Sequence, residues 1–139
     1  MPAPFPLFPN LHATRKVLVM DDEEMVREVV REMLRETGYE VACAKEGEEA
    51  IELYFKAKMS ADPFSVVIMD LTIPGGMGGE EAIGKLREFD SGVKAVVSSG
   101  YSDDPVMANF RDHGFNAVIA KPFRFTELNN ILQLLASTP

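Results

Sequence analysis

Acidic side chains stand at two points in the chain where their spacing is suited to metal chemistry. Asp21 and Asp22 follow the apolar run 17–20. Asp70 follows a second apolar run, 66–69. If the two runs are neighbouring strands, the carboxylates converge, and like charges about 5 Å apart repel by roughly 3 kcal/mol per pair at an effective dielectric constant near 20. A cation must offset this repulsion, and oxygen ligands favour a hard ion, so Mg²⁺ is the candidate cofactor.

A hydroxyl group and a lysine stand at the ends of two other apolar runs. Ser99 follows the run 95–98, and Lys121 follows the run 117–120. Each residue alone has a simpler explanation. Carboxylates near a helix N-terminus interact favourably with the helix dipole, by about 0.3–1 kcal/mol, and a lysine can be a solvated charge. The combination of carboxylates, hydroxyl and lysine at strand ends favours a single polar site.

Strands that alternate with helices are needed to bring these residues together. From Lys16 onward, short apolar runs alternate with helical patterns, which indicates βα units and a parallel sheet. Ligands bind at the carboxyl ends of the strands in such a sheet. We therefore expect an α/β fold of the flavodoxin-like (βα)5 type, a doubly wound parallel sheet with strand order 2-1-3-4-5. The expected strands are residues 17–20, 39–44, 66–69, 95–98 and 117–120.

Apolar residues at helical spacing form stripes that we expect to face the sheet. These stripes are Met25, Val26, Val29, Val30, Met33 and Leu34; Ala50, Ile51, Tyr54 and Phe55; Ala82, Ile83 and Leu86; and Leu128, Ile131, Leu132 and Leu135. One more helix is indicated by capping residues. Asp103 and Asp104 are candidate N-caps, Pro105 suits a first turn, and Gly114 marks the expected end.

Length, composition and charge restrict the class of protein. The 139 residues are 46% hydrophobic, enough for one domain with its own core. The apolar runs are far shorter than the roughly 20 residues that cross a bilayer, so we expect no membrane insertion. Lys and Arg number 14 against 22 Asp and Glu, and the net charge of −8 disfavours direct binding of nucleic acid. The lone Cys43 is expected to be a core thiol in a reducing, cytoplasmic protein.

Two segments differ from the rest of the chain in composition. Residues 1–14 hold four prolines and no formal charge, which predicts an arm or linker before a domain at 15–139. The glycine run within 75–79 lacks the Gly-Lys-Ser/Thr of a phosphate-binding P-loop, and it is expected to be a flexible loop before a helix.

Four motifs together resemble the response-regulator receiver domains of two-component signalling. They are VLVMDDEE at 17–24, VIMDLTIPG at 67–75, VVSSGY at 96–101 and KPF at 121–123. The resemblance covers about residues 15–137. The sequence DLTIPGGMGG at 70–79 is most similar to that of receivers attached to hybrid sensor histidine kinases.

The resemblance implies a metal-binding role for several of these residues. Asp21 and Asp22 match the acidic pair that holds Mg²⁺ in the family. Asp70 matches the phosphoacceptor and a third metal ligand. Thr72 matches the residue whose backbone carbonyl also binds the metal.

Further positions match residues that respond to the phosphoryl group. Ser99 matches the hydroxyl that follows this group, and Lys121 matches the lysine that pairs with a phosphoryl oxygen, with its bond to Pro122 cis in the family. Gly100 gives the following loop backbone freedom. Val118 stands where receivers commonly carry Tyr or Phe, three residues before the lysine, so we expect no output through an aromatic flip at this position. Tyr101 lies nearby in the sequence, but no feature of the sequence assigns it the role of that ring.

The implied function is phosphoacceptance rather than ordinary enzyme catalysis. A histidine kinase or phosphotransfer domain would donate a phosphoryl group to Asp70, and the product would switch a protein-binding surface. Catalysis would be limited to self-catalysed phosphotransfer and slow autodephosphorylation. We expect a receiver from the C-terminal part of a hybrid kinase, with a free-standing regulator as the alternative.

Three other functions compete with this interpretation. A haloacid dehalogenase-type phosphatase also uses an aspartate nucleophile, but it needs a second Asp at the position that Thr72 occupies. A flavodoxin-type cofactor binder needs a hydroxyl- and glycine-rich phosphate loop where the acidic residues 21–24 stand. A receiver-like protein-binding module that is not phosphorylated stays open as an alternative.

Overall fold

Five parallel strands form the centre of the protein, where the apolar runs predict them. The computed structural model describes residues 15–101 and 103–136, and each strand begins and ends within one residue of its prediction. The order in the sheet is β2-β1-β3-β4-β5, as expected. The strands are β1 Lys16–Met20, β2 Glu40–Ala44, β3 Val66–Asp70, β4 Ala95–Ser99 and β5 Ala117–Ala120.

The register of the strands brings their carboxyl ends to the same edge of the sheet. Met20 of β1 pairs with Met69 of β3, so Asp21 and Asp70 leave adjacent strands at the same level. Ser99 of β4 pairs with Ala120 of β5, which immediately precedes Lys121. The topology therefore gathers the predicted polar residues along one edge.

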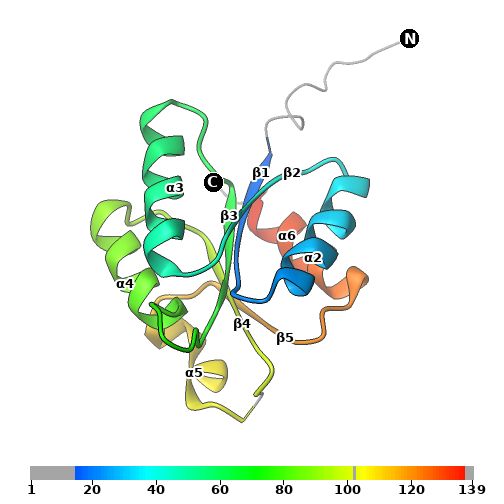
Figure 1. Ribbon diagram of the computed structural model, residues 1–139, viewed down its shortest axis with the longest axis vertical. Helices are drawn as coiled ribbons and strands as arrows, with labels where there is room; N and C mark the ends of the chain where they lie inside the picture. The colour runs from blue at the N-terminus through cyan, green and yellow to red at the C-terminus, as the bar shows by residue number, and fades with distance from the viewer. Residues whose placement is uncertain (1–14, 102, 137–139) are drawn as a thin grey trace.

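Helices cover both faces of the sheet. The helices α2 Glu24–Glu36 and α6 Phe125–Ala136 pack on one face. The helices α3 Gly47–Met59, α4 Gly79–Phe89 and α5 Pro105–Ala108 pack on the other face (Figure 1). None of the helices within 15–101 and 103–136 is long and apolar enough to cross a membrane.

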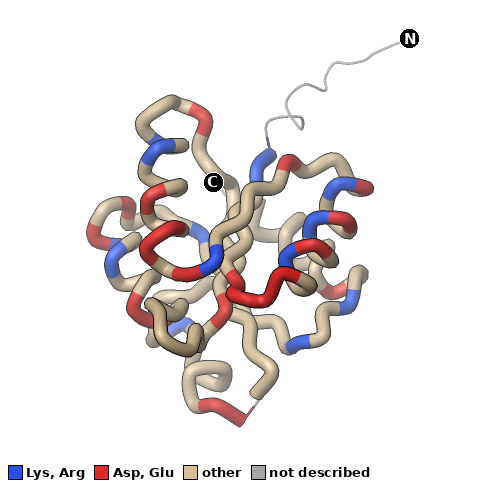
Figure 2. Tube along the Cα trace, in the orientation of Figure 1, with Lys and Arg blue, Asp and Glu red and all other residues tan. Residues whose placement is uncertain are grey.

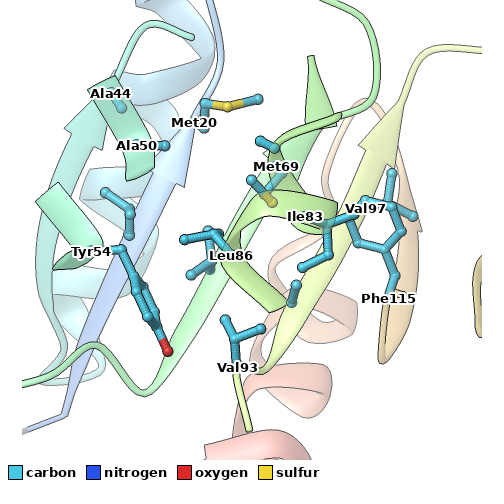
Figure 3. Close-up of a cluster of buried hydrophobic side chains, with 14 of the residues drawn as sticks. Met20, Ala44, Ala50, Tyr54, Met69, Ile83, Leu86, Val93, Val97 and Phe115 are labelled. Carbon is cyan, nitrogen blue, oxygen red and sulfur yellow. The ribbon is translucent and has the colours of Figure 1, made fainter. Parts of the chain in front are cut away.

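Two hydrophobic clusters result from the alternation of side chains along the strands. Ile68 of β3 packs with α2 and α6, whereas the next residue, Met69, belongs to the cluster on the opposite face. Figure 3 shows that opposite cluster, to which α4 contributes Ile83 and Leu86. Because both faces of the sheet are covered, the central strand β3 is buried at every residue.

Some residues of the predicted apolar stripes do not face the sheet. Val30 and Leu34 of α2 are fully buried, but Met25 and Val29 are 77% and 44% exposed. Phe55 of α3 is likewise 46% exposed. The expectation that each whole stripe is buried is therefore wrong for these residues. Their stripes are wider than the arc by which one helix contacts a sheet.

The helix expected between Pro105 and Gly114 is not continuous. Asp104 caps α5 through a bond from the Val106 backbone N–H, as predicted, but α5 ends after one turn. A 3-10 helix, η2, follows at Phe110–His113. Both the backbone and the side-chain amide of Asn109 donate to the Pro105 carbonyl, but the Asn109 backbone, with φ of −119° and ψ of 41°, turns out of the α-helix. Gly114 ends η2 in the left-handed conformation.

The glycine run before α4 is closely packed at its end rather than a free loop. A Cβ atom on Gly78 would collide with the Leu71 carbonyl oxygen, and one on Gly79 would lie 2.8 Å from the Asp70 carbonyl oxygen. The Gly79 N–H donates to the Leu71 carbonyl. The prediction of a flexible loop is therefore wrong for Gly78 and Gly79, which fit α4 tightly against the end of β3.

Replacing Gly84 by alanine should stabilise the protein by about 0.5–1 kcal/mol. Gly84 lies inside α4, is exposed, and has no atom within 4 Å of a Cβ built on it. Gly38→Ala is the matched control, because Gly38 has equal space but a φ of +90°. Urea unfolding should show a gain for Gly84→Ala and a loss for Gly38→Ala; the opposite pattern would contradict the argument.

A polar cluster joins α3 to the residue that follows α4. The Tyr54 hydroxyl donates to Asp90 Oδ2 at 2.7 Å, and Lys58 Nζ lies 2.8 Å from the same oxygen. Partial burial alone would raise the pKa of Asp90, but bonds from Lys58, Tyr54 and the Gly92 N–H outweigh it and lower the pKa. Burial and the Asp90 carboxylate raise the pKa of Tyr54, so the phenol remains a donor.

This cluster should make the stability of the protein depend on pH in the acidic range. Because folding lowers the pKa of Asp90 below 3.8, its contribution is complete above pH 3.8 and is lost as the pH falls from there through the lower pKa of the folded state. We expect Asp90→Asn to lower the free energy of unfolding at pH 7 by about 1–2 kcal/mol. The deficit should shrink toward pH 3. Urea titrations across this range check it, with the exposed Glu28→Gln as control; a deficit independent of pH would contradict it.

Candidate functional site

Three carboxylates and one lysine meet at the carboxyl ends of β1, β3 and β5. One oxygen atom from each of Asp21, Asp22 and Asp70 lies within 4.8 Å of the others. Lys121 Nζ lies 2.7 Å from Asp21 Oδ2 and 3.2 Å from Asp70 Oδ2. Figure 2 shows acidic positions gathered where β1 leads into α2. The residues predicted from separate strand ends therefore form one site.

Asp21 is held rigidly at the base of this site. It is buried, and its Oδ1 accepts a hydrogen bond of 2.9 Å from the Glu23 backbone N–H. Its Oδ2 contacts the Lys121 ammonium through charge rather than through a well-directed hydrogen bond. A buried carboxylate oxygen in this condition suits a metal ion or metal-bound water. Asp22 is exposed beside it and offers a further oxygen from the open side.

Asp70 is the buried carboxylate of β3. Burial raises its pKa, the positive charge of Lys121 opposes this, and the negative charge of Asp21 adds to it, so the pKa remains above its usual value. Further positive charge at the site would favour the ionised carboxylate. The possible ligand atoms of the site are carboxylate oxygens. Both these oxygen ligands and the raised pKa of Asp70 fit a site for a small divalent cation.

Lys121 is the positive group shared by the carboxylates. Partial burial alone would lower its pKa, but contacts with Asp21 and Asp70 outweigh that effect and raise the pKa. Its backbone N–H donates to the Ser99 carbonyl at 3.0 Å, which fixes the chain at this point. The Lys121–Pro122 peptide bond is cis, as the family resemblance implies.

Ser99 ends β4 and is buried beside the site. Its hydroxyl oxygen accepts a hydrogen bond of 2.9 Å from the Tyr101 backbone N–H. A Cβ on Gly100 would meet nothing within 4 Å, so no neighbouring atom packs closely against this position. The Tyr101 side chain is 73% exposed, so it makes no buried contact with Ser99 or the carboxylates.

Two other predicted residues occupy distinct positions. Thr72 is exposed just after β3, and its backbone N–H bonds to the Asp70 carboxylate. Val118 is half-buried and packs with the cluster under α3, α4 and α5. Val118 therefore belongs to the packing of the sheet, whereas Thr72 belongs to the site.

Sequence reasoning missed one residue that supports the site. Arg27 of α2 donates from Nη1 to the Asp21 carbonyl at 2.8 Å, which links the helix to the acidic loop. The feature of the sequence that points to Arg27 is its position one helical turn after Glu23. The Glu23 carbonyl accepts a hydrogen bond from the Arg27 backbone N–H. The sequence-based prediction for this loop concerns Asp21 and Asp22 as metal ligands and assigns no role to Arg27.

Cys43 of β2 is half-buried rather than fully in the core. Its Sγ accepts a hydrogen bond of 3.1 Å from Arg31 Nη2. Burial raises the pKa of the thiol, and the positive charges of Arg31 and Arg27 only partly oppose it. The thiol is therefore protonated at neutral pH and unsuited to nucleophilic catalysis.

An apolar groove lies beside the polar site. It has a volume of about 220 Å³. Met25 and Val29 of α2 form one wall, and Phe123 lies on the other, next to Lys121 and Pro122. The exposed residues of the α2 stripe therefore lie beside Lys121, one of the groups of the polar site.

Together, these groups can support transfer of a phosphoryl group to a carboxylate. Asp70 supplies a nucleophilic oxygen, Lys121 supplies fixed positive charge, and the acidic pair can hold a divalent cation. Phosphoryl transfer depends mainly on positioning and charge stabilisation, which this arrangement provides.

Comparisons with known proteins point to the same chemistry. Residues 17–133 match the family model of the response regulator receiver domain. A response regulator receiver protein of Anaeromyxobacter sp. is 35% identical over 108 residues, 78% of this chain, but the match spans only 43% of that protein. Chemotaxis protein CheY of Thermotoga maritima is 32% identical over 111 residues, 79% of this chain and 88% of CheY.

A solved structure agrees in fold and in sequence. The response regulator TrrA of Thermotoga maritima, crystallised in complex with Mg²⁺-BeF, superposes with a TM-score of 0.75 at 30% identity. The match covers 87% of this chain and 98% of TrrA. With the family model spanning most of the chain and the strand order and polar site in agreement, this protein belongs to the response regulator receiver domains.

Proposed function

We propose that the protein accepts a phosphoryl group on Asp70, with Mg²⁺ as cofactor, and passes the signal to a protein partner. The observation that supports this most directly is the contact of 3.2 Å between the buried Asp70 carboxylate and Lys121, inside the cluster with Asp21 and Asp22. Mg²⁺ in the TrrA complex and the oxygen donor set of this chain support the choice of metal.

The proposed transfer uses the side chains of the site in separate roles. An Asp70 oxygen attacks the phosphorus of a phosphohistidine, the P–N bond breaks, and the bonding electrons leave with the imidazole, which takes up a proton. Lys121 pairs with a phosphoryl oxygen and limits the build-up of negative charge. Asp21, Asp22, Asp70 and the Thr72 carbonyl would hold Mg²⁺, which neutralises charge on the phosphoryl oxygens when it is bound.

The donor is proposed to be a histidine kinase or a phosphotransfer domain. The groove of Met25, Val29 and Phe123 supports docking of an apolar protein surface directly beside Lys121. The amino-acid sequence of residues 70–79 supports the proposal that this receiver comes from a hybrid kinase. A cytoplasmic site of action is part of the proposal, as is a signalling role without ordinary enzyme turnover. The predicted arm at 1–14 lies outside the described residues and stays a prediction.

Phosphorylation should change the structure at Ser99 and in the loop from Gly100 to Asp104 rather than in β5. If the Ser99 hydroxyl turns toward a phosphoryl oxygen, its bond from the Tyr101 N–H is lost, and amide exchange at Tyr101 should rise. Val118 has no ring to rotate, and its β-branched side chain has few rotamers. Hydrogen exchange with and without a phosphoryl mimic checks this. Changes confined to 70–80, or centred on 116–120, would contradict it.

The proposed function is tested by intact mass after incubation with acetyl phosphate. The expected result is a gain of one phosphoryl group with Mg²⁺ present and none after chelation by EDTA. If the folded protein gains no phosphoryl group from acetyl phosphate or from any phosphorylated kinase tested, the unphosphorylated protein-binding module becomes the better function. A gain that is independent of Mg²⁺ would overturn the metal part of the proposal.

A further inference from the structure

The acidic loop that leads from β1 into α2 is tied to the rest of the protein by its backbone. The Asp21 backbone N–H donates to the Ala44 carbonyl of β2 at 3.0 Å, and the Glu23 backbone N–H donates to Asp21 Oδ1 at 2.9 Å. Asp22 lies between them and is exposed, yet one of its oxygens lies within 4.8 Å of oxygens of Asp21 and Asp70. The place of the Asp22 carboxylate in the cluster therefore depends on the course of the backbone on either side of it.

A side chain of α2 fixes the peptide group between Asp21 and Asp22. Arg27 Nη1 donates to the Asp21 carbonyl oxygen at 2.8 Å. That oxygen belongs to the planar unit that joins the Cα atoms of the two aspartates, so a bond to it restricts the direction in which the chain leaves Asp21. The guanidinium is always protonated, and a hydrogen bond from a charged donor is stronger than one between neutral groups.

Arg27 can hold this loop because its own position is fixed by α2. Its backbone N–H donates to the Glu23 carbonyl at 3.2 Å, and its side chain is half-buried. Val30 and Leu34, about one and two turns further on, are fully buried and anchor the helix to the sheet. The bonds that connect Arg27, Asp21 and Glu23 therefore make the acidic loop and the first turn of α2 a single unit.

We propose that Arg27 is a positioning residue for the metal site, an inference that rests on the proposed function. Its bond to the Asp21 carbonyl keeps Asp22 where its carboxylate can share a divalent cation with Asp21 and Asp70. Without this bond, the planar unit after Asp21 can rotate, and the exposed Asp22 side chain can turn away into solvent. Groups that orient metal ligands without touching the metal change its affinity. Arg27 therefore increases the affinity for Mg²⁺ although it supplies no ligand atom.

The charge of Arg27 acts in the opposite direction from its hydrogen bond. A cation beside the acidic loop repels Mg²⁺, so its removal should strengthen Mg²⁺ binding if Arg27 acted only through charge. Loss of the bond to the Asp21 carbonyl should weaken Mg²⁺ binding instead. The sign of the change in affinity therefore separates a positioning role from an electrostatic one.

Isothermal titration calorimetry of the full chain with Mg²⁺, in the absence of a phosphodonor, tests the proposal. Arg27→Ala should weaken Mg²⁺ binding by about fivefold, a smaller loss than for tightly bound metals because Mg²⁺ keeps several waters. Arg31→Ala is the matched control. Arg31 is also a half-buried arginine of α2, one turn further on, but its Nη2 donates to Cys43 Sγ at 3.1 Å rather than to the acidic loop. This variant should bind Mg²⁺ within about twofold of the parent.

A conservative variant and a measurement without metal test the bond itself. Arg27→Lys keeps the charge and a donor on a long side chain, so it should bind Mg²⁺ within about twofold of the parent. Amide exchange without Mg²⁺ reports on the loop directly. Exchange of the Glu23 N–H, which bonds to Asp21 Oδ1, should rise by at least about threefold in Arg27→Ala and stay at the parental rate in Arg31→Ala. Circular dichroism confirms that each variant is folded.

Several results would overturn Arg27 as a positioning residue. They are parental or tighter Mg²⁺ binding in Arg27→Ala, an equal loss of affinity in Arg31→Ala or in Arg27→Lys, and unchanged exchange at Glu23. A parent protein that binds no Mg²⁺ would overturn the metal part of the proposed function together with this inference. Parental binding in Arg27→Ala, with a parent that does bind Mg²⁺, would overturn the inference alone.

Discussion

Asp70→Asn should abolish the gain of a phosphoryl group from acetyl phosphate, with a rate at least about a thousandfold below that of the parent. Asparagine keeps the shape of the side chain but replaces a nucleophilic carboxylate oxygen with a neutral amide. Among the described residues, Asp70 is the buried carboxylate that contacts Lys121 from the end of the central strand. Neither Asp21, already engaged by the Glu23 N–H, nor exposed Asp22 combines burial with that position.

A matched variant separates loss of the nucleophile from loss of charge or stability. Asp90→Asn removes one negative charge, as Asp70→Asn does, but from the Tyr54 and Lys58 cluster. It should still gain one phosphoryl group at close to the parental rate. Intact mass measured over time checks both proteins at the same donor and Mg²⁺ concentrations. If Asp70→Asn still gains a phosphoryl group at the parental rate, Asp70 is not the phosphoacceptor.

The core of the site could be predicted because the sheet imposes a simple rule. In a parallel sheet with level register, the residue after each strand lies at the same edge. Finding the strands by their apolar runs therefore also located Asp21, Asp70, Ser99 and Lys121. The contact between Asp21 and Lys121 joins residues 100 positions apart, yet it follows from this topology.

Other features depend on tertiary contacts that a periodic pattern does not contain. Apolar spacing placed Phe55 in the α3 stripe, but α4 lies beside it so that the ring meets Phe89 near solvent. Capping residues located the start of α5 at Asp104, whereas its early end comes at Asn109, where the backbone turns out of the α-helix with φ of −119° and ψ of 41°. Propensity identifies where elements begin more readily than which neighbours cover them or stop them.

Asp22→Ala should weaken Mg²⁺ binding by at least about tenfold, which corresponds to about 1.4 kcal/mol. Asp22 is exposed, but one of its oxygens lies within 4.8 Å of oxygens of Asp21 and Asp70. A hard divalent cation prefers carboxylate oxygens and keeps several waters, so an exposed ligand on the open side of the site suits it. Isothermal titration calorimetry of the parent should show one site, with clearly lower affinity in the variant.

Glu24→Ala distinguishes direct ligation from the general effect of negative charge. Glu24 lies two residues after Asp22, is exposed and carries the same charge, but it stands at the first position of α2, outside the acidic cluster. Charge alone acts on Mg²⁺ through water and salt, so its removal should lower affinity by less than about threefold at 0.15 M salt. Equal losses in the two variants would show that Asp22 attracts the ion only through its charge, and parental affinity in Asp22→Ala would show that Asp22 takes no part in binding. A larger loss for Asp22→Ala supports direct ligation, because the two variants remove the same charge from neighbouring positions and differ in whether that carboxylate belongs to the cluster.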